Sequence, residues 1–261
     1  MKPVKSVKQV KTVKNNTEQH VNTHNLTNVP KNTKTMILSP KSGKRKIEEL
    51  TMADFTNNRY KLDDQSYIEY YPNFVQDTDA VLIELIGSAD LTYDQSKLPD
   101  AVPWKQGIYN MFGKPVPTPR LLYAMRDADQ DISCVYKITG SAVWSDQIKK
   151  LRDAVAAKTG RSFRYAQMNL YRNGVDYIGF HTDSEVAPND IIASVSIGTT
   201  REFRLISADF KNNDLPMYSI KLEPGSLIIM NEYAAKHNWK HEIVQDPKIK
   251  ELRLNITFRP N

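Results

Sequence analysis

Three side chains of this 261-residue chain have the types and spacing of a metal site. His181 and Asp183 are separated by one residue, and residues two apart in an extended segment project to the same side, so both can reach one ion. His241 follows in a later apolar segment. Two histidines and one carboxylate on one face of an iron ion are the ligands of non-haem Fe(II) oxygenases. A His-x-Asp triplet alone is also typical of a surface pair or a core histidine, so the hypothesis depends on other residues.

The segment Arg253–Arg259 reads Arg-Leu-Asn-Ile-Thr-Phe-Arg, so a strand there has one polar face and one apolar face. The polar face consists of Arg253, Asn255, Thr257 and Arg259. Two arginines that face a barrel interior are costly unless an anion meets them, and arginine offers forked donors to a carboxylate. A dicarboxylate between this strand and the metal satisfies that need. The alternative is an outward face with both arginines in water.

Short apolar or alternating segments dominate the chain after Gly160. They are residues 164–171, 191–197, 202–206, 217–222, 226–230, 241–244 and 252–258. Such strands without intervening helices predict an antiparallel barrel or jelly roll. Two packing helices are predicted before them, one capped by Asp77 and ending near Ile86, the other running from the N-cap Ser145 to Gly160. The expected fold class is mainly β with flanking helices (α+β).

The segment from Leu98 to Arg120 contains five prolines among large apolar residues. Because proline breaks helices and lacks a ladder donor, we expect neither a long helix nor a central strand there. We expect residues 1–57 to be a basic, disordered tail, residues 58–163 an N-terminal extension with the packing helices, and residues 164–261 the jelly-roll core.

Positive charge is concentrated at the N-terminus. Residues 1–46 hold eleven lysines and arginines against the single acid Glu18, and they contain no aromatic residue. This composition predicts disorder. A solvated tail and an arm that exchanges counterions with nucleic-acid phosphates are both open interpretations. Lys44-Arg45-Lys46 also fits part of a nuclear import signal.

Cys134 is the only cysteine, which excludes an internal disulfide and a cysteine-based zinc cluster. No apolar stretch approaches the roughly 18 residues of a membrane span, and the N-terminus lacks the apolar core of a signal peptide. A soluble, intracellular protein is expected.

Residues from about Tyr136 to Arg259 resemble the AlkB family of Fe(II)- and 2-oxoglutarate-dependent dioxygenases. The matching stretches are Asn169–Gly174, Ile178–Glu185, Ile192–Gly198, Pro224–Leu227, Trp239–His241 and Arg253–Arg259. The resemblance implies a double-stranded β-helix (jelly roll) with an N-terminal nucleotide-recognition lid. It implies that His181, Asp183 and His241 bind Fe(II). It also implies that 2-oxoglutarate is held by Asn169, Tyr171, Arg253, Asn255, Thr257 and Arg259.

Asn110–Gly113, followed by Pro119-Arg120, is similar to the hydrophobic finger of AlkB homologues that act on duplex DNA, whose aromatic tip replaces an extruded base. This similarity implies that substrate is bound by Met111, Phe112, Gly113, Arg120, Tyr136 and Glu185. Ile138 stands where those relatives have an aromatic residue that stacks on the base. This difference leaves open whether the substrate is DNA or a related molecule such as RNA.

The function that the resemblance implies is oxidative dealkylation of N-alkylated bases in DNA, a direct DNA repair reaction that uses Fe(II), 2-oxoglutarate and O₂. No catalytic residue beyond the metal ligands is expected. The expected partner is alkylated DNA, with RNA as a second candidate, and the expected state is a monomer without membrane contact, nuclear in a eukaryote. One alternative is an AlkB-type dioxygenase that acts on RNA or on a non-nucleic-acid substrate. Another is a catalytically silent nucleic-acid-binding module.

Overall fold

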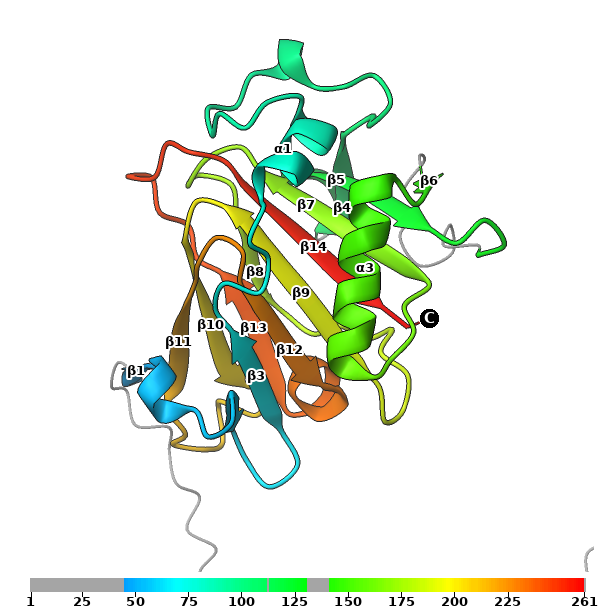
Figure 1. Cartoon of the computed structure of the whole chain (residues 1–261). Coiled ribbons are helices and arrows are strands. Elements are labelled where there is room, and N and C mark those ends of the chain that lie inside the picture. The colour runs from blue at the N-terminus through cyan, green and yellow to red at the C-terminus, as the bar shows by residue number, and fades with distance from the viewer. Residues whose placement is uncertain (1–44, 112, 131–140, 261) are drawn as a thin grey trace, which may run out of the picture. The chain divides into compact units, whose positions relative to one another are not determined.

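Two β-sheets face each other in the computed structural model, which describes residues 45–111, 113–130 and 141–260 (Figure 1). These residues belong to one of the two units into which the chain divides, residues 40–261; the other unit, residues 1–39, lies outside the described residues. The smaller sheet has the spatial order β1 (Ile47–Glu49), β11 (Met217–Leu222), β10 (Arg201–Ser207), β13 (Trp239–Ile243) and β8 (Ile178–His181).

The larger sheet contains the most deeply buried strands. Its order is β2 (Arg59–Lys61), β3 (Tyr67–Tyr71), β12 (Leu227–Asn231), β9 (Ile191–Gly198), β14 (Arg253–Arg259), β7 (Tyr165–Tyr171), β5 (Lys114–Arg126) and β4 (Lys105–Met111), with β6 (Ser141–Val143) paired to β5. From β7 to β14 the chain alternates between the two sheets, except at the β10–β11 hairpin, which stays in the smaller one. This alternation is a jelly roll, so the predicted mainly β fold with flanking helices is confirmed.

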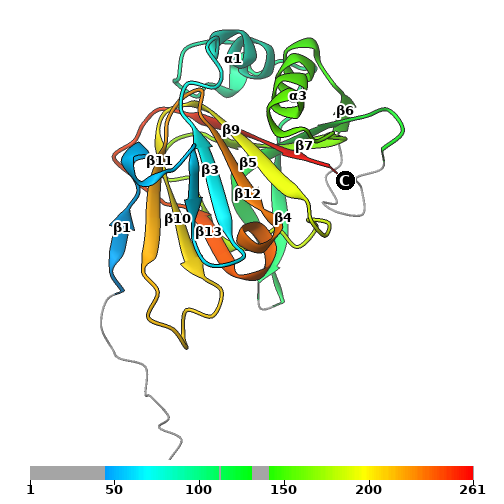
Figure 2. The ribbon, with the colours of Figure 1, turned by 60° about the horizontal axis from the view of Figure 1, so that its bottom comes forward.

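Two helices cover the outer face of the larger sheet. α1 (Asp79–Ile86) and α3 (Asp146–Thr159) lie on the same side of it (Figure 2). Their apolar residues pack with Leu254, Ile256 and Phe258 of β14 in one core cluster. The helical stripes at Leu82 and Leu85 and at Ile148 and Leu151 are buried as the sequence predicts. Because β14 turns its apolar side to the helices, its polar side faces the space between the sheets.

The shorter elements connect the strands. They are the 3₁₀ turns η1 (Met52–Asp54) and η2 (Gln95–Lys97) and the π-helical turn η3 (Tyr233–His237). In the part of the chain that the structure describes, no helix is both long and apolar enough to span a bilayer.

The expected tail of residues 1–57 is too long at its C-terminal end. Ile47–Glu49 pair in parallel with Met217–Ser219, and Leu50 is buried. A three-residue strand is too short for its alternation to be recognised in sequence. Residues 58–163 also add strands to the larger sheet, because β3 pairs with β12 and β5 with β7.

The prediction that the proline-rich segment forms no central strand was wrong for β5. β5 lies between β4 and β7, but its pairing with β7 starts only at Leu121. Pro115 and Pro117 lie opposite Asn110 and Ile108, and Pro119 lies where the β4–β5 register shifts, so all three precede the pairing with β7. The part of β5 that contains the prolines therefore has a neighbouring strand on one side only, as expected for an edge strand.

Candidate active site

A cavity of about 550 Å³ lies between the sheets, and residues of the β4–β5 hairpin help to line it. The polar face of β14 forms one wall, and residues of β8 and β13 form the opposite wall. His181, Asp183, His241, Arg253 and Arg259 all line it. The structure thus brings into one space residues that are far apart in the sequence.

His181 and His241 are direct cross-strand partners of β8 and β13, with ring centroids 4.3 Å apart. Asp183 follows the end of β8, where its backbone N–H donates to the carbonyl of Ala235 at 2.9 Å. One ligand atom from each of the three residues lies within 4.8 Å of the others. Asp183 Oδ2 is 3.4 Å from His241 Nε2, and Asp183 Oδ1 is 4.0 Å from His181 Nε2. The set predicted from the sequence is therefore a compact His-Asp-His cluster.

His181 and Asp183 have the protonation states that a metal requires. His181 Nδ1 lies 2.9 Å from the carbonyl of Gly179, so Nδ1 carries the proton and Nε2 is available to an ion. Burial, together with the charge of His241, lowers the pKa of His181 to about 3, so its ring is neutral at pH 7. Burial raises the pKa of Asp183, but Arg259 and the two histidines together lower it by a larger amount. The carboxylate is therefore ionised. This donor set fits Fe(II).

Arg259 lies between two carboxylates. Its Nη2 is 3.1 Å from Asp183 Oδ1, and its Nη1 makes an ion pair with Glu185. Arg259 was expected to hold 2-oxoglutarate and Glu185 to lie near the substrate base. In the structure the two residues pair with each other beside the metal ligands, and both line the cavity.

Arg253 has a different environment on the same strand face. Its side chain is buried, and its Nη2 donates to Ser196 Oγ at 2.9 Å. Its Nε and Nη1 have no hydrogen-bond partner in the described part of the chain. Burial lowers the pKa of Arg253 to about 10, so it remains a cation at neutral pH. A buried cation with unmatched donors at a cavity wall fits a carboxylate ligand such as that of 2-oxoglutarate.

A polar network forms the wall between the arginines. Asn255 Nδ2 donates to Ser194 Oγ at 2.6 Å, and Thr257 Oγ1 donates to Asn255 Oδ1 at 3.0 Å. Asn169 joins it through its Nδ2, 3.4 Å from Asn255 Oδ1. Arg120 donates from β5 to Asn169 Oδ1 at 2.7 Å, so a residue expected to bind substrate contacts one expected to bind cosubstrate.

Ser194 and Ser196 are contacts that the sequence analysis missed. They alternate with Val195 and Ile197 on β9, and this alternation could have shown that they face the same side as the polar residues of β14.

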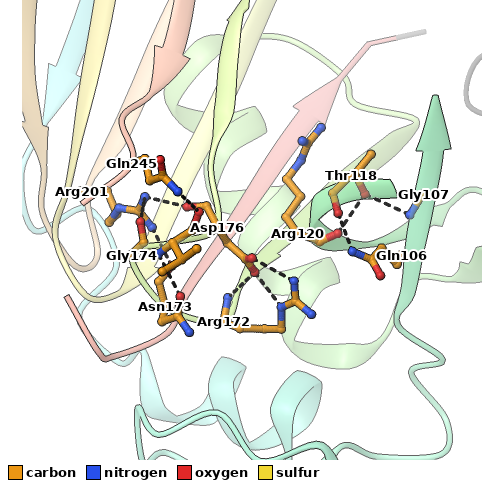
Figure 3. Close-up of polar contacts among 11 residues, drawn as sticks. Gln106, Gly107, Thr118, Arg120, Arg172, Asn173, Gly174, Asp176, Arg201 and Gln245 are labelled. Carbon is orange, nitrogen blue, oxygen red and sulfur yellow. Dashed lines mark hydrogen bonds and ion pairs between the residues drawn. The ribbon is translucent and has the colours of Figure 1, made fainter. Parts of the chain in front are cut away.

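The cavity rim on β4 and β5 was also missed. Thr118 Oγ1 accepts from the N–H of Gly107 at 3.0 Å and donates to the carbonyl of Arg120 at 2.9 Å (Figure 3). These bonds hold a β-bulge between Gln106 and Ile108, and Ile108 is 73% exposed at the rim. A bulge beside a site redirects side chains.

The predicted finger is only partly described. Met111 ends β4, and Gly113 adopts a left-handed φ of 78° at the turn into β5. Phe112 and Tyr136 lie outside the described residues.

Comparison with known proteins agrees with this geometry. Residues 68–259 match the 2OG-Fe(II) oxygenase superfamily. The human protein named DNA oxidative demethylase ALKBH2 is 32% identical over 159 residues, which cover 57% of this chain and 59% of that protein. Human alpha-ketoglutarate-dependent dioxygenase alkB homolog 3 is 33% identical over 44% of this chain and 43% of that protein. ALKBH2 of Arabidopsis thaliana is 28% identical over 68% of each chain.

The chain therefore spans about three fifths or less of the two human relatives. The predicted resemblance to AlkB homologues is confirmed by these matches, and the family match accounts for most of the chain. Fe(II) and 2-oxoglutarate, from which that family takes its name, suit the His-Asp-His cluster and the unmatched donors of Arg253. The chain belongs to the 2OG-Fe(II) oxygenase superfamily.

Proposed function

We propose that this protein is an Fe(II)- and 2-oxoglutarate-dependent dioxygenase that removes N-linked alkyl groups from bases in DNA. The observation that carries the proposal is that one cavity holds a His-Asp-His cluster and a buried arginine with unmatched donors. The substrate class comes from the names of its relatives, DNA oxidative demethylases among them.

His181, Asp183 and His241 would hold Fe(II), and Arg253 would hold a carboxylate of 2-oxoglutarate. With both groups and O₂ bound, one oxygen atom enters the alkyl carbon and the other enters succinate as 2-oxoglutarate loses CO₂; the hydroxylated alkyl group then leaves the base as an aldehyde.

The chain's own residues position these groups. Arg259 holds the carboxylate of Asp183 in place through a 3.1 Å ion pair, and the Gly179 carbonyl fixes the ring orientation of His181. The wall of β14, β7 and β9 surrounds the cosubstrate with side chains that already hydrogen-bond each other, so little reorganisation is needed on binding.

An alkylated base must leave the helix stack to enter this cavity. Phe112, which follows Met111 in the sequence, is proposed to fill the gap that the base leaves. Phe112→Ala should lose much more activity on duplex than on single-stranded substrate, because a single strand has little stacking to replace. An equal loss on both, with a large drop in melting temperature, would instead assign Phe112 to the core. Ile108→Ala, at the cavity rim on β4, is the control. It shows how much activity is lost when any exposed apolar side chain of the rim is removed.

Succinate release tests the proposal against its alternatives. We expect release to rise when a methylated DNA oligonucleotide is added and to stay at the basal rate with the unmethylated strand. Stimulation by methylated RNA alone, or by neither nucleic acid, would indicate a related dioxygenase with another substrate. No release under any condition would indicate a silent binding module. We further propose that the protein acts as a monomer inside the cell, in the nucleus of a eukaryotic host.

A further inference from the structure

Arg201 is a buried arginine just outside the cavity. It starts β10, and its guanidinium donates to backbone carbonyls of two separate segments (Figure 3). Nη1 is 3.2 Å from the Asn173 carbonyl, and Nη2 is 2.8 Å from the Asp176 carbonyl and 2.6 Å from that of Val244. It therefore ties the loop between β7 and β8 to the chain after β13.

The ring of Tyr171 lies close to two guanidinium groups. The guanidinium carbon of Arg201 is 5.5 Å from the ring centroid, and that of Arg253 is 5.3 Å from it. Both arginines are 1% exposed, and neither makes an ion pair with a carboxylate among the residues that the structure describes. Two buried positive charges beside one aromatic ring create a strongly positive environment, which is costly without an anion.

The charges of Arg201 and Arg253 act on each other. Burial is the main reason that the pKa of Arg253 falls, and the charge of Arg201 lowers it further. Asp176 and Asp246 are near enough to offset part of the burial of Arg201. The carboxylate of Asp176, however, is occupied by Arg172, at 2.8 and 2.9 Å. An anion that binds Arg253 is therefore attracted by the positive charge of Arg201 as well.

A 2-oxo acid would offer its keto oxygen and the adjacent carboxylate to the metal, and its distal carboxylate would then lie farther from the metal. Arg259 contacts the metal ligand Asp183, whereas Arg253 lies six residues earlier on the same strand. Arg253 is therefore the arginine that the distal carboxylate would meet, and the ring of Tyr171 lies close to both Arg253 and Arg201.

We propose that Arg201 is a positioning residue that makes the site selective for a dicarboxylic 2-oxo acid. Its positive charge, next to Tyr171 and Arg253, strengthens the attraction of the site for the second carboxylate. This inference rests on the proposed 2-oxoglutarate site and not on the identity of the oxidised substrate. Arg201 itself lies outside the cavity lining, so it acts without touching the acid.

The test is calorimetric binding of two acids to protein loaded with Mn(II), without nucleic acid. 2-Oxoglutarate carries the distal carboxylate, and 2-oxovalerate has the same chain length without it. Arg201→Gln removes the charge but keeps side-chain donors for the backbone carbonyls, and Arg201→Lys keeps the charge. We expect Arg201→Gln to reduce the affinity ratio between the two acids about ten-fold, and Arg201→Lys to preserve it.

Arg172→Gln is the matched control, because Arg172 braces the same loop through Asp176 but is partly exposed. Its affinity ratio should equal that of the unaltered protein. An unchanged ratio in Arg201→Gln, or an equal fall in all three variants, would overturn the proposal. Arg201→Met replaces Arg201→Gln if the latter does not fold. The Arg201 proposal and the proposed function can fail separately. If Arg201→Gln lowers the affinity ratio as expected but the unaltered protein does not dealkylate bases, the Arg201 proposal stands and the proposed function is rejected.

Discussion

Arg253 and Arg259 are the same residue type on the same face of β14, yet their surroundings differ. Arg259 meets Asp183 and Glu185, whereas Arg253 donates to Ser196, and its Nε and Nη1 have no hydrogen-bond partner among the described residues. The sequence alternation predicts that both arginines face inward but treats them alike. Only the neighbouring strands decide which arginine has a carboxylate partner within the protein and which is available to a ligand.

Replacing Arg253 by Leu should weaken 2-oxoglutarate binding while iron binding persists. A hydrogen bond to a charged group typically contributes about 1.5–3 kcal/mol to the free energy of binding, and each 1.4 kcal/mol changes the affinity ten-fold. We therefore expect the affinity for 2-oxoglutarate to fall roughly ten- to hundred-fold. The measurement is the 2-oxoglutarate concentration that gives half-maximal succinate release. Arg204→Leu is the control, because Arg204 pairs with Glu202 instead. An unchanged concentration dependence in Arg253→Leu would place the 2-oxoglutarate carboxylate elsewhere.

His241 offers a direct test of the metal cluster. His241→Ala should lose bound iron, because two ligands remain and an open-site metal needs at least three protein donors to be held firmly. His237→Ala is the matched control, since His237 precedes it by four residues and pairs with Glu232. Metal content after dialysis measures both variants. Normal iron content in His241→Ala would remove this histidine from the site.

At the scale of elements, the registers of the strands determine which residues meet. The seven strands predicted after Gly160 and both helices are present, because their alternation and their caps are local signals. The direct pairing of His181 with His241 was not predictable, because β8 and β13 are distant in sequence and no local pattern encodes their register. The residue type and its place in a later apolar segment indicated His241 as the third ligand, and the resemblance to AlkB homologues supported it.

The turn between β2 and β3 holds β13 through one carboxylate. Asp63 accepts the indole N–H of Trp239 at 2.7 Å and the N–H groups of Ser66 and Gln65 at 2.7 and 2.8 Å. Partial burial raises the pKa of Asp63, but these donors lower it overall. Its ionised form therefore stabilises the fold above its ordinary pKa of 3.8, and this contribution is lost as the pH falls below that value.

Asp63→Asn should therefore lower the free energy of unfolding at pH 7 by about 1–2 kcal/mol. The difference from the unaltered protein should begin to shrink below about pH 4, where the carboxyl becomes protonated in the unfolded chain, and should vanish once the pH falls below the lowered pKa of the folded state. Urea unfolding at pH 7 and pH 3 measures it. Asp64→Asn, whose carboxylate is almost fully exposed, should change little at either pH. A difference that stays constant with pH would show that the charge of Asp63 is irrelevant.

At the scale of the whole molecule, one apolar core lies apart from the cavity and the other borders it. The first core packs the helices against the outer face of the larger sheet, and the second packs the two sheets together around Trp239 and Tyr218. Ile192, Phe203 and Met230 belong to the second core and also line the cavity. Variants of the polar cavity residues should therefore change binding and leave the core beneath the helices intact.

The basic N-terminal segment lies outside the described residues, and its role is predicted from charge. Residues 1–44 contain nine lysines and one acid, whereas Lys46 already bonds through its carbonyl to Met217. Deleting residues 1–44 should weaken DNA binding and flatten its dependence on salt, because fewer counterions are released. Filter binding over a range of salt concentrations measures this. The affinity for 2-oxoglutarate should not change and serves as the control. An identical dependence of DNA binding on salt before and after the deletion would show that the segment has no role in DNA binding.

Repair of alkylated bases in this cavity can be measured directly. The measurement is mass spectrometry of a DNA oligonucleotide that carries one N-methylated base, after incubation with the protein, Fe(II), 2-oxoglutarate and O₂. We expect conversion to the unmodified oligonucleotide, with one succinate and one formaldehyde released per base, and no conversion by Asp183→Ala. Succinate release by a protein that leaves every methylated DNA and RNA strand unchanged would rule out this function.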